Sequence, residues 1–130
     1  MQEVLKEWIE KAEGDYRTAG RELAAADNPN FDAVCFHSQQ CIEKLLKAAL
    51  IAAGVRPPKI HDLPELSRRL SAVAPDWSPE ERDLIWLTKG AAEFRYPGDS
   101  ADRGEANESF TLCKRLRTRL RRLIKTLGVS

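Results

Sequence analysis

The stretch that decides the fold is Asp32-Ala33-Val34-Cys35-Phe36-His37-Ser38-Gln39-Gln40-Cys41-Ile42-Glu43-Lys44-Leu45-Leu46-Lys47-Ala48-Ala49-Leu50. Its apolar residues recur three and four positions apart on two adjoining faces, as a helix with about 3.6 residues per turn requires. A narrow polar row remains, made by His37, Gln40, Lys44 and Lys47. A helix that is apolar around most of its circumference is usually buried, so this polar row needs partners in the protein or in a ligand. The pattern predicts a central helix from about Phe31 to Ala53, ended by Gly54.

The other apolar patterns predict more helices and no strands. They cover 2–26, a third helix opened by His61-Asp62-Leu63-Pro64, a fourth from the Ser78 cap and Pro79 to about Ala92, and a last one from Arg103 or Gly104 to Leu127. Proline in a first turn and a polar cap before it are typical helix starts. The sequence therefore predicts one all-α domain, an up-down bundle of four to five helices.

The composition bounds the function only loosely. The 130 residues suit one domain, and a hydrophobic share of 42% argues against disorder. The 21 basic and 20 acidic residues nearly cancel, so net charge indicates neither nucleic acid nor membrane. No apolar run reaches the roughly 18 residues of a membrane span, and Glu3, Glu7 and Glu10 argue against a secretory signal. The cysteines, Cys35, Cys41 and Cys113, lie in apolar helical patterns without a C-x-x-C pair. We expect buried thiols without a disulfide and a cytoplasmic protein.

Candidate binding residues lie in three places. His37, Gln40 and Lys44 could form a polar floor for a nucleotide base or phosphate. The alternative is an internal network, for example one in which Gln40 caps a neighbouring helix. His61 precedes a helix start, where anions bind, or it bonds to the backbone there. Arg95 and Tyr96 interrupt the periodicity before the last helix, and such a pair suits phosphate and base contacts. The alternative is an Arg that bridges acidic residues and a Tyr that packs on Pro97.

The last helix is strongly basic. Residues 103–127 hold eight basic and two acidic side chains, whereas the first 27 residues hold seven acidic and four basic ones. This asymmetry indicates either a strip that faces RNA or a solvated face partly paired with the acidic first helix. The sequence has neither a glycine-rich phosphate loop nor a cluster with metal-ligand spacing, so we expect no metal and no cofactor.

Three signatures occur in order along the chain and carry a resemblance to a known family. They are the stretch from Cys35 to Ala48, then Lys59-Ile60-His61-Asp62-Leu63, then Phe94-Arg95-Tyr96-Pro97, preceded by Trp8, Ala12 and Asp15. Together they resemble the HEPN domain, a nucleotide-binding helical domain of higher eukaryotes and prokaryotes. The resemblance covers nearly the whole chain. It implies a helical bundle, frequent homodimers, and association with nucleotides or RNA.

The same resemblance implies a partner and, in some members, an activity. Many prokaryotic members are encoded beside a minimal nucleotidyltransferase and form toxin–antitoxin pairs. Catalytic members are metal-independent ribonucleases with an Arg followed, after about four to six residues, by a His near the last helix. After Arg95 the eligible positions hold Ser100, Ala101 and Asp102, so that motif is absent there. The literal match Arg56-Pro57-Pro58-Lys59-Ile60-His61 spans a proline connector, and we interpret it as coincidence.

Three functional hypotheses follow. The first is a nucleotide- or RNA-associated HEPN protein paired with a nucleotidyltransferase. The second is a ribonuclease that uses Arg95 with a displaced histidine, His37 or His61. The third is a dimerisation module without catalysis. We also predict a homodimer, because the central helix is apolar over more of its circumference than one small bundle requires.

Overall fold

A computed structural model describes residues 2–93 and 97–128 of the 130-residue chain. Within these ranges it has no strand and five helices: α1 (Gln2–Ala24), α2 (Phe31–Ala52), α3 (Leu63–Val73), α4 (Glu81–Glu93) and α5 (Arg103–Leu127). The all-α class predicted from the sequence is therefore confirmed.

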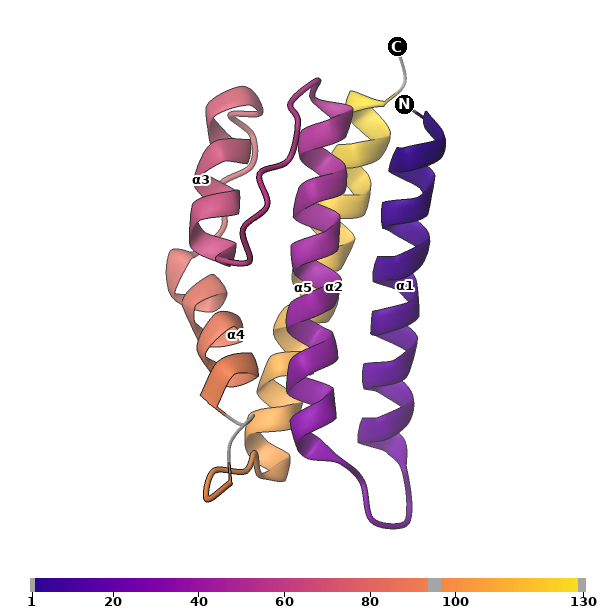
Figure 1. The fold of residues 1–130 in the computed structure, drawn as a ribbon, viewed down its shortest axis with the longest axis vertical. Coiled ribbons are helices and arrows are strands. Elements are labelled where there is room, and N and C mark those ends of the chain that lie inside the picture. The colour runs from indigo at the N-terminus through magenta and orange to yellow at the C-terminus, as the bar shows by residue number, and fades with distance from the viewer. Residues whose placement is uncertain (1, 94–96, 129–130) are drawn as a thin grey trace.

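The helices form an up-down bundle (Figure 1). In this view α1 runs downward, α2 upward, α4 downward and α5 upward, with the short α3 beside the connector that follows α2. The chain thus returns through α4 before α5 begins, and α2 and α5 point the same way. The beginning of α1 and the end of α5 lie at the same end of the bundle.

α2 is the centre of this bundle. It contacts α1, α3, α4 and α5, and its apolar residues Ile42, Leu45, Leu46 and Leu50 are completely buried. Four helices of the same chain therefore cover the wide apolar surface of α2. The argument that this surface exceeds what one bundle can bury is wrong, so it gives no reason to expect a homodimer. The homodimer itself stays a prediction.

Helix ends follow local chemistry, with two corrections. Asn30 caps α2 by accepting from the Ala33 amide at 3.0 Å, and Gly54 follows α2 with a φ of 84°, which glycine adopts without strain. The first helix ends at Ala24, before the expected residue 26. The fourth begins at Glu81 and not at Pro79.

Trp77 explains the late start of α4. Its ring is buried, its indole nitrogen donates to Ser67 Oγ at 2.9 Å, and its carbonyl accepts from Ser71 Oγ at 2.7 Å. These two bonds fix the segment before α4 against α3. The segment is therefore held in a non-helical conformation, and α4 begins only after it.

Cys35, Cys41 and Cys113 are free, buried thiols on α2 and α5. None of the helices in the described ranges is long and apolar enough to cross a membrane.

Candidate functional site

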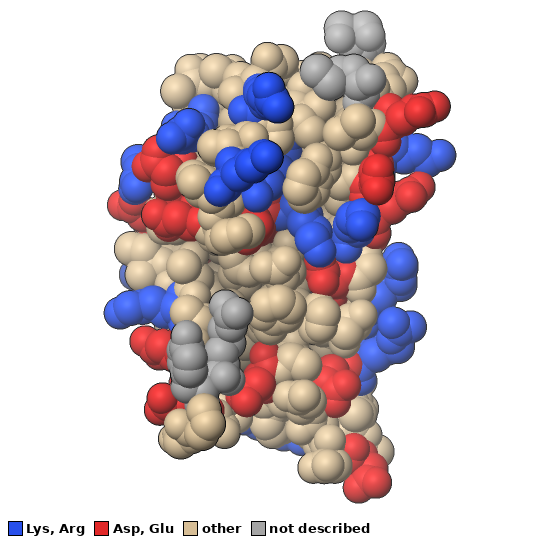
Figure 2. Space-filling view, viewed as in Figure 1, with Lys and Arg blue, Asp and Glu red and all other residues tan. Residues whose placement is uncertain are grey.

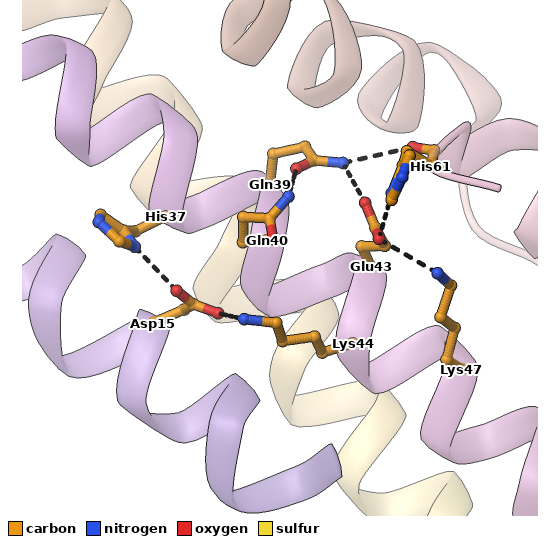
Figure 3. Close-up of polar contacts among 8 residues, drawn as sticks. All are labelled: Asp15, His37, Gln39, Gln40, Glu43, Lys44, Lys47 and His61. Carbon is orange, nitrogen blue, oxygen red and sulfur yellow. Dashed lines mark hydrogen bonds and ion pairs between the residues drawn. The ribbon is translucent and has the colours of Figure 1, made fainter. Parts of the chain in front are cut away.

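The polar row of α2 divides into two clusters, drawn in Figure 3. The first, which we call the Asp15 cluster, consists of Asp15 on α1 with His37 and Lys44 on α2. The Asp15 carboxylate is buried and accepts from His37 Nδ1 at 2.8 Å and from Lys44 Nζ at 2.6 Å. Both carboxylate oxygens therefore have a partner, and the two α2 side chains are held toward α1. This is the internal network that the sequence left open as an alternative.

The second group, the Glu43 cluster, surrounds a buried carboxylate on α2. Glu43 accepts from Gln39 Nε2 at 3.1 Å, from Lys47 Nζ at 3.3 Å and from His61 Nδ1 at 2.8 Å. Gln40 joins the cluster by donating from Nε2 to Gln39 Oε1 at 2.8 Å. A buried charge needs a countercharge and hydrogen bonds, and Lys47, itself buried against the Trp8 ring, supplies the countercharge.

His61 differs from the rest of the Glu43 cluster in its exposure. Its side chain is 81% exposed, whereas that of Glu43 is 5% exposed. The carboxylate holds the inner nitrogen, Nδ1, as a proton donor, so the neutral ring carries no proton on Nε2. The imidazole is thus fixed from inside while most of its surface meets solvent. Such a ring can accept a proton at Nε2 or, once protonated, bind an anion.

A cleft of about 340 Å³ opens beside these groups, between α2, α4 and the connector that follows α2. The residues that line it are Phe36, Gln39, Gln40, Glu43, His61, Thr88, Ala91 and Ala92. Phe36 is one of the few large apolar side chains left exposed. The Thr88 hydroxyl is buried and has no hydrogen-bond partner among the described residues. The cleft therefore combines an aromatic surface, an amide and an imidazole.

The candidate residues from the sequence do not all meet in this cleft. Gln40 and His61 line it together, whereas His37 and Lys44 belong to the Asp15 cluster. Arg95 and Tyr96 lie outside the described residues, so the predicted meeting of Arg95 with the polar row stays a prediction. Two of the residues that line the cleft, Ala91 and Ala92, come shortly before Arg95 in the sequence.

Sequence reasoning missed three members of the site. Glu43 and Gln39 are buried polar residues in an otherwise apolar helix, and that placement was the signal that could have identified them. Phe36 precedes Gln40 by four residues and so lies on the polar side of the helix. An aromatic ring at that position was the signal that could have identified it.

A larger hollow, of about 650 Å³, lacks this chemistry. It lies between the start of α1 and the end of α5 and has Leu5, Ile9 and Ile124 among its lining residues. It contains none of the candidate residues. Among the described residues, no three His, Cys, Asp or Glu side chains gather as metal ligands would. Surface charge of both signs is interspersed on the face shown in Figure 2.

Comparisons with known proteins agree with this fold. A family model described as the HEPN domain matches residues 5–123. A solved structure described as that of an archaeal HEPN homologue superimposes with a TM-score of 0.69 at 21% sequence identity, and the match covers 92% of this chain and 97% of the other. Comparison with curated protein sequences gives no match. Because the family model spans most of the chain, the protein belongs to the HEPN domain family, whose members are generally associated with nucleotides or RNA.

Proposed function

We propose that this protein binds a nucleotide, or the nucleotides of a short RNA, in the cleft between α2 and α4. The observation that carries the proposal is the His61 ring, which buried Glu43 holds at 2.8 Å while 81% of the side chain stays exposed. The ring satisfies the buried carboxylate on its inner side, and its orientation leaves the outer edge accessible to a ligand. The phosphate of a nucleotide is a suitable anion for a protonated imidazole.

The rest of the cleft supports the same ligand class. Phe36 offers an exposed aromatic surface on which a base can stack, a contact worth about 1–3 kcal/mol per base. Gln40 offers an amide that can read a base edge. A mononucleotide fits a cleft of about 340 Å³, which is at the small end of ligand sites.

Calorimetric titration with adenosine and guanosine monophosphates tests the proposal. His61→Ala should weaken binding at least about tenfold, the scale of one charge-assisted hydrogen bond, and should preserve the helical circular dichroism. Lys59→Ala is the matched control, because this exposed cation precedes His61 by two residues and does not line the cleft. Equal affinities for the His61 variant and the native protein would remove His61 from the site.

We include Arg95 in this proposal on the basis of the sequence alone. A guanidinium next to an aromatic ring suits a phosphate and its base, and the chain reaches Arg95 directly after α4, which lines the cleft. Arg95→Ala should weaken nucleotide binding by about 1–3 kcal/mol, the scale of a hydrogen bond to a charged group, and leave the fold intact. An unfolded variant would show instead that the role of Arg95 is structural.

A second candidate function, metal-independent cleavage of RNA, is favoured by the Glu43–His61 pair. A carboxylate that orients an imidazole through Nδ1 leaves Nε2 as a general base. In this mechanism His61 would take the proton from an RNA 2′-hydroxyl as that oxygen attacks the neighbouring phosphorus. The bond from phosphorus to the 5′-oxygen breaks, which leaves a 2′,3′-cyclic phosphate and a 5′-hydroxyl that takes its proton from water. Cleavage by purified protein in EDTA, abolished by His61→Ala and retained by Lys59→Ala, would support it. Uncleaved RNA in that assay would leave binding alone as the function.

We further propose that the protein acts in the cytoplasm as one half of a toxin–antitoxin-like pair with a small nucleotidyltransferase, and that it forms a homodimer. The three buried free thiols suit a reducing compartment. A nucleotidyltransferase frame in the neighbouring gene, and growth arrest relieved by coexpressing its product, would support the pair. Light scattering that shows only the 14.7 kDa chain at micromolar concentration would overturn the homodimer.

A further inference from the structure

The five arginines between residues 115 and 122 of α5 fall into two sets that the sequence could not separate. Arg117 and Arg121 face α1 and pair with Glu13, with Arg117 Nε at 2.7 Å from Glu13 Oε2 and Arg121 at 3.3 Å from Glu13 Oε1. These two arginines join the helices of the bundle. A second set, Arg115, Arg119 and Arg122, is exposed and makes no ion pair within the described chain. We call this second set the basic ridge.

The basic ridge is a continuous row. Its members are four and three residues apart, a spacing that places side chains on one face of a helix over about two turns. The buried residues Leu116 and Leu120 face the core from the other side of α5. Glu108, also exposed, lies two turns before Arg115 on the same face and ends the basic row.

The ridge is also partly preorganised. The Arg119 guanidinium lies 5.1 Å from the centre of the Trp77 ring, which is only 2% exposed. A hollow of about 240 Å³ lies between this pair, Arg122 and Asp76. A second hollow, of about 600 Å³, reaches Arg122 from the α1 side. Arg122 thus lies between two hollows. Arg119 is already ordered against the Trp77 ring, so its side chain loses little conformational entropy when a ligand binds.

We propose that the basic ridge binds the phosphate backbone of single-stranded RNA, as a site separate from the cleft. Three guanidinium groups in a row without carboxylate partners repel each other and are best neutralised by a ligand with several regularly spaced negative charges. A membrane surface is disfavoured because the large exposed apolar side chains lie on other helices, α1 to α4. This inference rests on the proposed function only for the class of ligand, which is RNA.

A dependence on RNA length follows from having two sites. A mononucleotide is large enough to occupy the cleft and too small to cover the basic ridge as well. A longer strand can contact all three arginines. The ridge should therefore raise the affinity for an oligonucleotide and leave the affinity for a mononucleotide unchanged.

The test compares two triple variants that lose the same charge. R115Q/R119Q/R122Q removes the ridge, and R21Q/R82Q/K89Q removes three exposed basic residues on α1 and α4. Binding of an unstructured RNA of roughly a dozen nucleotides is measured by fluorescence anisotropy between about 50 and about 200 mM salt. The ridge variant should bind at least about tenfold more weakly at the lower salt concentration. Its slope of log affinity against log salt should fall by about 2, at about 0.7 for each phosphate that the variant no longer neutralises.

Several outcomes decide the matter. An equal loss in the control variant would show that only net charge counts and would overturn the ridge. Equal displacement of the RNA by poly-glutamate would overturn RNA in favour of an acidic protein partner. If R115Q/R119Q/R122Q is less folded by circular dichroism, the double variant R115Q/R122Q replaces it, because this variant keeps the Arg119–Trp77 contact. Its slope of log affinity against log salt should still fall by about 1.4. RNA binding that depends on the ridge in a protein that binds no mononucleotide would support the ridge while the cleft proposal fails.

Discussion

At the scale of single residues, buried carboxylates organise the polar side of α2. Asp15 and Glu43 are both nearly inaccessible, and each holds one lysine and one histidine of the chain. The two clusters differ in what they leave exposed, because the His37 side chain is 29% exposed and that of His61 is 81% exposed. On this contrast rests our proposal of a mainly structural role for the Asp15 cluster and a binding role for the Glu43 cluster.

Asp15→Asn tests the structural role. The change leaves the Lys44 ammonium and His37 without their carboxylate, and both are exposed enough to turn partly toward water. We therefore expect the free energy of unfolding to fall by about 1–3 kcal/mol, the cost of a lost hydrogen-bonded charge. Urea denaturation should show a lower midpoint with an unchanged slope.

Asp27→Asn is the control for this change, because Asp27 is exposed and makes no ion pair in the described part of the chain. An unchanged midpoint for Asp15→Asn would show that the Asp15 cluster adds nothing to stability. Weaker nucleotide binding by a fully folded Asp15→Asn protein would instead place His37 and Lys44 in the binding site.

The polar row also shows how far sequence reasoning extends. Spacing alone placed His37, Gln40 and Lys44 on one face of a buried helix, which the structure confirms. It could not say which carboxylates they meet, because Asp15 is 22 residues from His37 and belongs to another helix. Lys47, expected in the same polar row, is buried between Glu43 and Trp8 instead. Tertiary partners of this kind depend on how helices pack and leave no local pattern.

At the scale of elements, α1 and α5 are joined by an arginine clamp. Arg117 binds Glu13 with two nitrogens and lies 4.1 Å over the centre of the Tyr16 ring, which in turn stacks on Phe110. The hydrogen bond from Arg117 holds the pKa of Glu13 below its ordinary value of 4.5. Glu13 lines the hollow of about 650 Å³ and Arg117 lines the hollow of about 600 Å³. The clamp therefore lies at the edge of both hollows.

Glu13→Gln tests the clamp through pH. Because the pKa of Glu13 is lower in the folded state, its contribution to stability is present above about pH 4.5 and is lost as the pH falls through the folded pKa. At pH 7 the variant should lose about 0.5–1 kcal/mol, the scale of a partly exposed ion pair. The difference between native protein and variant should shrink as the pH falls below about 4.5.

Thermal or urea denaturation across this pH range measures the effect of Glu13→Gln. Glu10→Gln is the matched control, because Glu10 lies one turn earlier on α1 and makes no ion pair in the described ranges. A difference between native protein and Glu13→Gln that stays constant with pH would show that the clamp acts through packing on Tyr16 and not through charge.

Helix positions were more predictable from the sequence than helix ends. The three-and-four spacing of apolar residues located all five helices, because it reflects burial against the core. The start of α4 was missed because Trp77 docks on α3 through Ser67 and Ser71. The cap of α5 was also missed. It is Asp102, which forms a capping box with Glu105.

At the scale of the whole molecule, the central place of α2 makes the bundle one cooperative unit. Because α2 contacts every other helix, none of the others can leave without exposing part of its apolar surface. The three cysteines report on this property, since Cys35 and Cys41 lie on α2 and Cys113 lies on α5. Each is at most 1% exposed.

We therefore expect all three thiols to react with a thiol reagent only when the whole domain unfolds. All three native thiols are inaccessible. In addition, the pKa is raised for Cys41 by its hydrogen bond with Cys113 and for Cys35 by burial, so little reactive thiolate forms at these two residues. Site-resolved mass spectrometry should give the same opening free energy for the three residues, equal to that from urea denaturation.

Ile124→Val sharpens this test, because it removes one methyl group from the buried face of α5. The change should cost about 1 kcal/mol. If the bundle opens as one unit, the labelling rates of all three cysteines should rise by the same factor, about fivefold. A faster rate at Cys113 alone would contradict the prediction, because α5 would then open without α2. It would also mean that the basic ridge and the α2–α4 cleft belong to parts of the molecule that can move independently.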